Sequence, residues 1–169
     1  MGRSERGVTM ADKYLAELNA LQIWIKAAVN IDSYRLTTAP PQLPRPVILW
    51  EAPHRGKDRN LGRWVYVNKV TQYGKLYVTN IDQLAVVQER LLTDLEERTG
   101  LLPITSVEGT VVTLLKRCEI TFENAENLNV PFNVVYEIAY TRIRPPEAPN
   151  ATFVGNRLKG GWGYDVKND

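Results

Sequence analysis

Residues 130–142 read VPFNVVYEIAYTR, an alternation of large apolar and polar side chains that decides the fold class. The apolar side chains share one parity: Phe132, Val134, Tyr136, Ile138 and Tyr140. A period of two residues is typical of a half-buried β-strand. Residues 110–122 alternate in the same way, although Lys116 interrupts their apolar side. The polar segment 123–129 between the two predicts a long antiparallel hairpin.

Two segments outside this hairpin predict helices. From Ala11 to about Val29, apolar residues recur at steps of three and four, which places them on one helical face. The apolar stripe widens at Ile23 and Trp24, so this helix is expected to pack on two sides, the second being a sheet or another subunit. The segment from Ile81 to Arg98 has a stripe of its own, made of Leu84, Val87, Leu91 and Leu95 with Leu92 beside it.

Both ends of the second predicted helix carry cap signals. Asn80 is a favourable N-cap residue, and Gln83 three positions later completes a capping-box pattern. Gly100 stands where a helix commonly ends in the left-handed conformation.

The segment before this helix predicts three shorter strands. Val47–Trp50 is a run of β-branched and aromatic type, expected to be a buried strand. Residues 64–70 and 75–79 are expected to pair around a tight turn at residues 72–74. The proline-rich residues 30–45 and the polar residues 53–62 are expected to be loops.

Together these elements predict an α+β fold, with an antiparallel or mixed sheet and two main helices packed on one of its faces. The expected organisation is a disordered leader at residues 1–10, one domain at 11–143 and a Pro/Gly-rich, extended C-terminal arm at 144–169. The arm retains large apolar groups, among them Trp162 and Tyr164, which predicts docking on its own domain or a neighbouring subunit rather than simple disorder.

Catalytic, metal-binding and cofactor-binding motifs are missing from the sequence. The chain holds one histidine, His54, and one cysteine, Cys118, too few for a zinc site of the usual Cys/His type. Cys118 lies on the apolar parity of a predicted strand, where a cysteine behaves as a small hydrophobic residue. The Gly160–Gly163 run neither follows a strand nor opens a helix, so it does not predict a phosphate-binding loop. The sequence therefore predicts a protein that is not an enzyme and has no cofactor.

Four basic residues gather around the predicted loop before Trp64: Arg55, Lys57, Arg59 and Arg63. Three interpretations stay open for them, namely a solvated loop, an electrostatic contact with an acidic partner protein, or a contact with nucleic acid. The net charge of +2 across 169 residues does not decide among them. No stretch is long and apolar enough to span a bilayer, so no membrane partner is expected.

The order of elements resembles the tail-terminator proteins of long-tailed bacteriophages, a ring-forming family that closes the tail tube and meets the head connector. The features that carry the resemblance are the leading helix Ala11–Val29, the proline-rich approach Pro44-Arg45-Pro46 into Val47–Glu51, strands Trp64–Thr79, the helix Ile81–Arg98, and a final hairpin containing Tyr136–Tyr140. The resemblance covers about residues 11–143. The basic residues 54–63, the long final hairpin and the arm from Arg144 to Asp169 depart from a minimal member.

The resemblance implies a structural virion protein that forms a homohexameric ring, contacts the tail-tube and head-connector proteins, and is assembled in the host cytoplasm. Arg55, Lys57, Arg59 and Arg63 become candidate partner contacts, and Trp162 and Tyr164 become candidates for docking the arm on an adjacent subunit. DNA passing through the ring is a further possible contact. Two alternatives stay open: another head–tail completion protein, or a nucleic-acid-binding accessory protein that uses residues 55–63.

Overall fold

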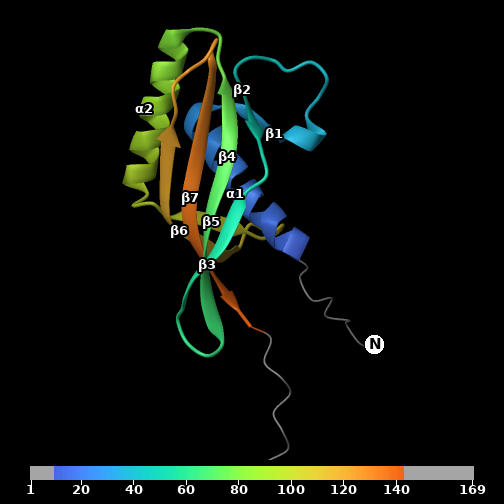
Figure 1. Cartoon of the computed structure of the whole chain (residues 1–169), viewed down its shortest axis with the longest axis vertical. Helices are drawn as coiled ribbons and strands as arrows, with labels where there is room; N and C mark the ends of the chain where they lie inside the picture. The colour runs from blue at the N-terminus through green and yellow to red at the C-terminus, as the bar shows by residue number, and fades with distance from the viewer. Residues whose placement is uncertain (1–9, 143–169) are drawn as a thin grey trace, which may run out of the picture.

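The computed structural model describes the backbone of residues 10–142 and the side chains from residue 13 onward (Figure 1). The elements in chain order are α1 (Met10–Val29), β1 (Asp32–Arg35), the short 3-10 helix η1 (Leu36–Thr38), β2 (Val47–Trp50), β3 (His54–Asn60), β4 (Val65–Tyr77), α2 (Ile81–Glu97), β5 (Leu102–Thr105), β6 (Val111–Phe122) and β7 (Asn129–Thr141). The first predicted helix therefore begins at Met10, one residue inside the expected leader. The C-terminal arm, with Trp162 and Tyr164, lies outside the described residues.

Strands β1 to β7 form a mixed sheet, which confirms the α+β class. Along the sheet the order is β1-β2-β4-β7-β6-β5, and β3 pairs with β4 beside this path. Only β1 and β2 run parallel among the paired strands described, and the other pairs are antiparallel. The two longest strands, β4 and β7, pair over their whole length and form the middle of the sheet (Figure 1).

The predicted hairpin at residues 64–79 is wrong, because β4 runs through the expected turn as one strand. Gln72 is completely buried, and its amide donates to the Glu51 carbonyl at 2.6 Å. Gly74 serves a close approach rather than a turn, since the ring of Phe132 and the indole of Trp50 fill the space that a side chain would need. Tertiary packing therefore overrides the turn signal of the Gln-Tyr-Gly sequence.

The predicted loop at residues 53–62 is also wrong, because most of it is strand β3. β2 and β3 pair in succession with the same edge of β4, β2 at residues 74–77 and β3 at residues 66–71. Most of β3 is exposed, and charged side chains are common on such edge strands. The polar sequence that indicated a loop is thus the sequence of a solvated edge.

Two further strands are missing from the sequence prediction: β1 lies within residues 30–45, where the expectation of a continuous loop is wrong, and β5 follows α2, where no strand is expected. The predicted final hairpin is confirmed as β6 and β7. Its first strand departs from a strict alternation at Arg117, which has a positive φ of 51° where the register with β7 shifts. Because of this irregularity, Leu115 lies on the buried side together with Cys118 and Ile120, although their numbers differ in parity.

The cap residues of α2 are as predicted, although Gln83 accepts from the backbone amide of Thr79 rather than from that of the N-cap Asn80. The Asn80 side chain accepts a hydrogen bond from the Gln83 amide at 2.7 Å, and the Gln83 side chain accepts from the Thr79 amide at 2.9 Å. Gly100 has a positive φ of 66° and donates to the Leu95 carbonyl, which closes the C-terminal end.

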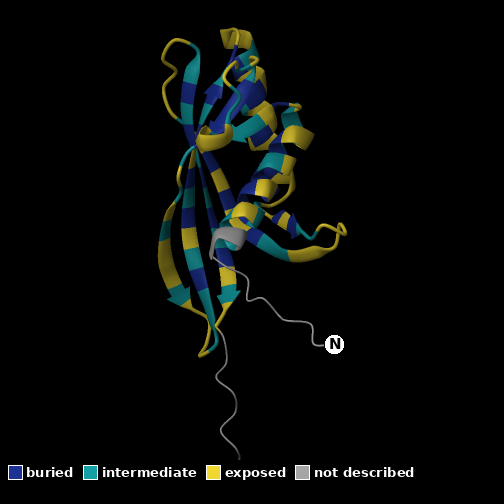
Figure 2. Cartoon of the chain, turned by 90° about the vertical axis from the view of Figure 1, so that its right-hand side faces the viewer, coloured by how far each residue is buried: buried dark blue, intermediate teal, exposed yellow. Residues whose placement is uncertain are grey.

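Both helices contribute to one hydrophobic core with the buried face of the sheet. Figure 2 shows buried and exposed residues alternating along the long strands. Trp24 of α1 is almost fully buried, and its indole donates to the Asp94 carboxylate of α2 at 2.7 Å, which ties the two helices together. Its neighbour Ile23 is instead half exposed.

The close approach at Gly74 gives a stability prediction. In Gly74→Ala the new Cβ would lie 2.6 Å from Cζ of Phe132, so we expect a loss of about 1–3 kcal/mol in unfolding free energy, measured by denaturant titration. The cost should shrink in a Phe132→Leu background, which removes the outer ring atoms. Gly56→Ala is the control, because nothing lies within 4 Å of its Cβ. An equal cost of Gly74→Ala in both backgrounds would contradict the packing argument.

Candidate interaction surfaces

Glu17 of α1 has a buried carboxylate, and this carboxylate binds Arg55, one of the predicted partner-contact residues. Both terminal nitrogens of Arg55 on β3 reach it, Nη1 to Oε1 at 3.1 Å and Nη2 to Oε2 at 2.5 Å. The hydroxyl of Tyr136 donates to Oε2 at 2.7 Å, and the hydroxyl of Tyr140 donates to Oε1. Glu17 is 0% exposed, so these four bonds from β3 and β7 replace its hydration. We call these four residues the Glu17 cluster.

The two tyrosines of the Glu17 cluster act as fixed donors. Burial and then the negative charge of Glu17 raise the pKa of Tyr136 far above its usual range. Burial also raises the pKa of Tyr140, with the hydrogen bond to Glu17 adding to it. Both phenols therefore keep their protons at any ordinary pH. The guanidinium of Arg55 also lies 5.7 Å from the centre of the Tyr14 ring, which anchors it a second time to α1.

Arg59, a second predicted partner contact, is also engaged within the chain. Its Nη2 lies 2.7 Å from Oε2 of Glu137, and its Nη1 pairs with Asp58. Arg117 approaches the other oxygen of Glu137 at 3.0 Å. The hydrogen bond from Arg59, with that from Arg117, holds the pKa of Glu137 below its usual range. Arg59 therefore joins β3 to β7. Its charge is balanced by carboxylates of the same chain, which weakens any electrostatic contact with a partner protein.

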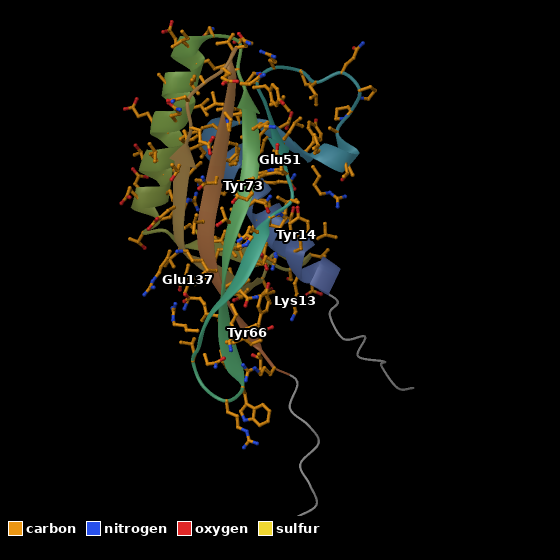
Figure 3. The ribbon with its side chains drawn as sticks, viewed as in Figure 1. Lys13, Tyr14, Glu51, Tyr66, Tyr73 and Glu137 are labelled. Atoms are coloured by element: carbon orange, nitrogen blue, oxygen red, sulfur yellow. The ribbon has the colours of Figure 1, made fainter. Side chains whose placement is uncertain are left out.

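Of the four predicted basic residues, Lys57 and Arg63 stay accessible. Lys57 is exposed on β3, and Arg63 lies at the tip of the β3–β4 hairpin with its guanidinium 4.9 Å from the Trp64 ring centre. The four residues thus do not form one basic patch. In Figure 3, Glu137, which is the ion-pair partner of Arg59, lies higher on the sheet than Tyr66, which is close to the hairpin tip.

The hairpin tip includes a cation that sequence reasoning missed. Arg142, just after β7, donates to the carbonyl of Arg63 at 3.1 Å and to the side chain of Asn60 at 2.8 Å. Its guanidinium also lies 5.5 Å from the Tyr66 ring centre. The full pairing of β4 with β7 brings Arg142 there from far along the chain. We call Arg63, Trp64, Tyr66 and Arg142 the hairpin-tip patch.

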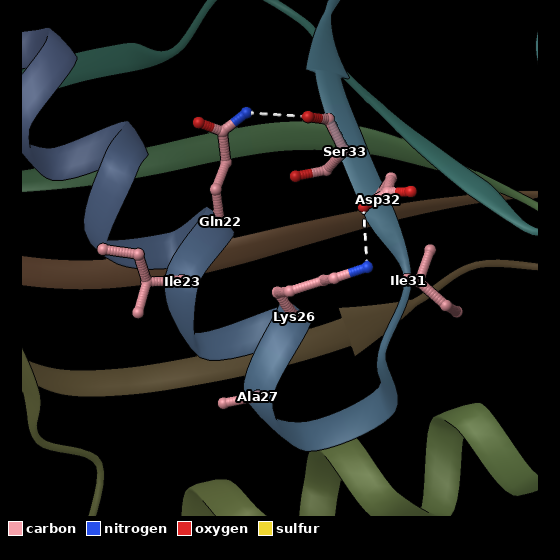
Figure 4. Close-up of a pocket in the computed structure, with 7 residues that line it drawn as sticks. All are labelled: Gln22, Ile23, Lys26, Ala27, Ile31, Asp32 and Ser33. Carbon is pink, nitrogen blue, oxygen red and sulfur yellow. Dashed lines mark hydrogen bonds and ion pairs between the residues drawn. The ribbon is translucent and has the colours of Figure 1, made fainter.

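A groove of about 470 Å³ lies between the C-terminal half of α1 and strand β1 (Figure 4). Ile23, which is 52% exposed, lies on the helical side of the groove. The ammonium of Lys26 on α1 pairs with the carboxylate of Asp32 on β1 at 2.7 Å. Gln22 donates to the backbone carbonyl of Ser33 at 3.0 Å. We call this the α1–β1 groove; it combines an apolar floor with a strand at the end of the strand order.

Exposed valines gather at the turn between β5 and β6. Val107 is fully exposed, Val111 is 55% exposed and Val112 is 68% exposed. The turn is closed by backbone bonds between Ser106 and Thr110 and by Gly109, which has a positive φ of 81°. Val111 and Val112 follow each other in β6 and therefore point to opposite faces of the strand, so the turn exposes apolar side chains on both of its sides. We call these three residues the valine tip.

The described residues offer little for catalysis or metal binding. Among them, no group of three or more His, Cys, Asp or Glu side chains is placed to hold a metal ion. Cys118 is buried, as its position in the strand predicted, and burial raises the pKa of its thiol to about 12. No helix in the described part of the chain has the length and apolar character to cross a membrane.

A scan against protein-family models and a search of the curated proteins gave no match for this chain. Of the predicted partner contacts, Trp162 and Tyr164 lie outside the described residues, Arg55 and Arg59 bind carboxylates of the same chain, and Lys57 and Arg63 stay accessible.

The Glu17 cluster predicts that Arg55 contributes to stability rather than to partner contact. Arg55→Met leaves the Glu17 carboxylate buried without its cation, so we expect a loss of about 3 kcal/mol in unfolding free energy. Denaturant titration measures it, with Lys57→Met as the exposed control on the same strand, expected within about 0.5 kcal/mol of the parent.

Adding Glu17→Gln to Arg55→Met should recover part of the loss, because it removes the stranded charge. Equal stabilities of Arg55→Met and Lys57→Met would contradict the role assigned to the cluster.

Proposed function

We propose that this chain is a structural assembly protein that joins copies of itself into a closed ring, with no catalytic step. The observation that carries the proposal is the pair of exposed apolar surfaces, the valine tip beside β5 and the α1–β1 groove beside β1. β1 and β5 stand at opposite ends of the strand order, so the two surfaces are different patches of one subunit. A ring needs such a pair, because each subunit must contact two neighbours through unlike faces.

In the proposed contact, the valine tip of one subunit enters the α1–β1 groove of the next. In this contact the side chain of Val112 would leave water and pack against Ile23 and Ala27 in the groove. Burying one valine side chain contributes about 1.5 kcal/mol or more, so a few such contacts per interface decide whether the ring forms. Lys26 and Asp32 compensate each other at the rim, which leaves no unpaired charge to bury.

We infer the biological setting of the ring from the resemblance to tail-terminator proteins. A tail-terminator-like subunit would form a homohexamer, contact the tail-tube and head-connector proteins, and reside in the virion after assembly in the host cytoplasm. Another head–tail completion protein would use the same two surfaces. The self-association test below addresses the contact that either role requires.

Light scattering coupled to size-exclusion chromatography tests the ring. The parent chain should elute as a closed oligomer, and Val112→Lys and Ile23→Lys should each weaken association by about tenfold or more. Thr121→Lys is the control, since Thr121 is exposed on the same strand as Val112 but away from the valine tip. Circular dichroism checks that each variant keeps its fold.

Mixing the two variants separates the proposed contact from a symmetric one. Ile23→Lys keeps an intact valine tip and Val112→Lys keeps an intact groove, so their mixture should form a heterodimer that cannot close into a ring. A parent chain that stays monomeric at high concentration, or association unaffected by either variant, would contradict the proposal.

Nucleic-acid contact through the hairpin-tip patch is a second candidate, favoured by the meeting of two guanidinium groups with two aromatic rings. The probe is a single-stranded oligothymidylate longer than the roughly 4–16 nucleotides that one OB fold covers. Binding should weaken as salt rises, and removing Arg63 and Arg142 together should flatten the logarithmic salt slope by about 0.7 for each lost phosphate contact.

The control for this experiment is Arg90→Ala, which removes an exposed cation of α2 instead. An unchanged affinity in the Arg63→Ala/Arg142→Ala variant, or no binding at low salt, would exclude this candidate.

A further inference from the structure

Opposite charges gather in two distant parts of the described structure. Residues 54–77, from the start of β3 to the end of β4, contain six lysine or arginine residues and one acidic residue. Helix α2 has the reverse composition, with five acidic residues and one arginine. In Figure 1 the tip of the β3–β4 hairpin lies at the lower end of the long axis, whereas α2 lies toward the upper end.

The end of α2 places acidic residues where they are electrostatically unfavourable. The last four residues of the helix read DLEE, which brings together Asp94, Glu96 and Glu97. The C-terminal end of a helix has a partial negative charge, so cations stabilise it and carboxylates do not. Arg98 compensates Asp94, which it binds at 2.6 Å. Glu96 and Glu97 have no ion pair among the described residues, so most of this negative charge is uncompensated within the subunit.

A groove of about 540 Å³ lies beside this acidic end, between α2 and the end of α1. The residues that line it include Ala28, Val86, Glu89, Arg90, Asp94 and Glu97. Glu89 and Glu97 are about 12 Å apart along the helix axis, and Arg90 balances only one of these two carboxylates. Val86, which is 46% exposed, adds an apolar wall. We call this the α2 groove; it suits a partner with more than one cation beside apolar or aromatic groups.

The hairpin-tip patch has this composition. Arg63 and Arg142 are both exposed, and neither has an ion pair within the part of the chain that the structure describes. Their guanidinium groups lie 4.9 Å from the Trp64 ring centre and 5.5 Å from the Tyr66 ring centre, respectively. Arg142 is also fixed by its hydrogen bonds to the Arg63 carbonyl and to Asn60. The patch therefore presents two cations that are already held in place, which lowers the entropy cost of a contact.

We propose that the α2 groove of one copy of this chain receives the hairpin-tip patch of a second copy, with Arg63 and Arg142 facing Glu89 and Glu97. The charges of the two surfaces are complementary, and one chain carries both surfaces. The incoming cations would also compensate the negative end of the helix. Because the two surfaces are different patches of the subunit, the contact is head-to-tail, and each copy has one neighbour at its hairpin tip and another at its groove.

This head-to-tail contact does not rest on the proposed ring. It uses no residue of the valine tip or the α1–β1 groove, so either contact can fail without the other. Where both form, the head-to-tail contact would join one ring to the next. The contact would also occupy the two cations that the nucleic-acid candidate requires, so a second copy and a nucleic acid are alternative occupants of the hairpin-tip patch.

Analytical ultracentrifugation of the Val112→Lys variant, which lacks the ring contact, tests this inference. At an ionic strength of about 0.01 M, where the Debye length is about 30 Å, the variant should still associate; at about 0.15 M, where it is about 8 Å, association should weaken. Adding Glu89→Lys and Glu97→Lys should weaken association by about tenfold or more. The matched control is Glu119→Lys with Glu123→Lys, which reverses two exposed charges at and just after the end of β6.

A charge exchange identifies the partner surface. Arg63→Glu with Arg142→Glu should also abolish association, and all four reversals in one chain should restore it, because opposite charges then face each other again. Glu97→Gln should weaken association without lowering the thermal midpoint, since its carboxylate opposes the end of the helix. Circular dichroism checks that each variant is folded.

Four results would each overturn the proposal. These are a Val112→Lys variant that stays monomeric at low salt, equal effects of the α2 and β6 reversals, no recovery with the four reversals together, and association that occurs only when an oligothymidylate is added. The last result would assign the hairpin-tip patch to nucleic acid.

Discussion

The fold depends on how it satisfies the hydrogen bonds of one carboxylate in its interior. Glu17 lies on the buried side of α1, away from water, and its two oxygens receive hydrogen bonds from β3 and β7. An uncompensated carboxylate there would cost several kcal/mol, so α1 can dock only where Arg55 and the two tyrosines are already aligned. A hydrophobic contact would tolerate sliding of the helix along the sheet. Four directed hydrogen bonds do not, and they set the position and rotation of α1.

That requirement explains why β3 is ordered although it is polar and mostly exposed. Arg55 reaches inward to Glu17 of α1, and Arg59 pairs with Glu137 of β7. The two arginines of this edge strand thus connect it to the helix and to the middle of the sheet. The interaction surfaces lie outside this framework. The valine tip and the hairpin-tip patch use side chains outside the core, whereas the α1–β1 groove shares Ile31 with it.

Sequence periodicity predicted the elements whose stability is local or whose faces differ clearly. The stripe and caps of α2 and the alternation of β7 belong to this group, and they sufficed for the α+β class. Failures came where the partner of a residue is distant in sequence. Arg55 in a polar run resembles a solvated cation until Glu17, 38 positions earlier, is placed beside it. Gly74 resembles a turn residue until Phe132 is packed over it. Arg142 could have been found only by pairing β7 with β4 in register.

The unequal pairing of the strands has a mechanical consequence. β4 and β7 are joined along their whole length, with hydrogen bonds perpendicular to the strand direction, so a pull along the strands would load all of these bonds in shear at the same time. β5, by contrast, is short and, among the strands that the structure describes, pairs with β6 alone, so a pull on the turn that joins them would peel the pair apart one bond after another. Tension applied through the β5–β6 turn would therefore be relieved at this periphery, while the β4–β7 ladder kept its length.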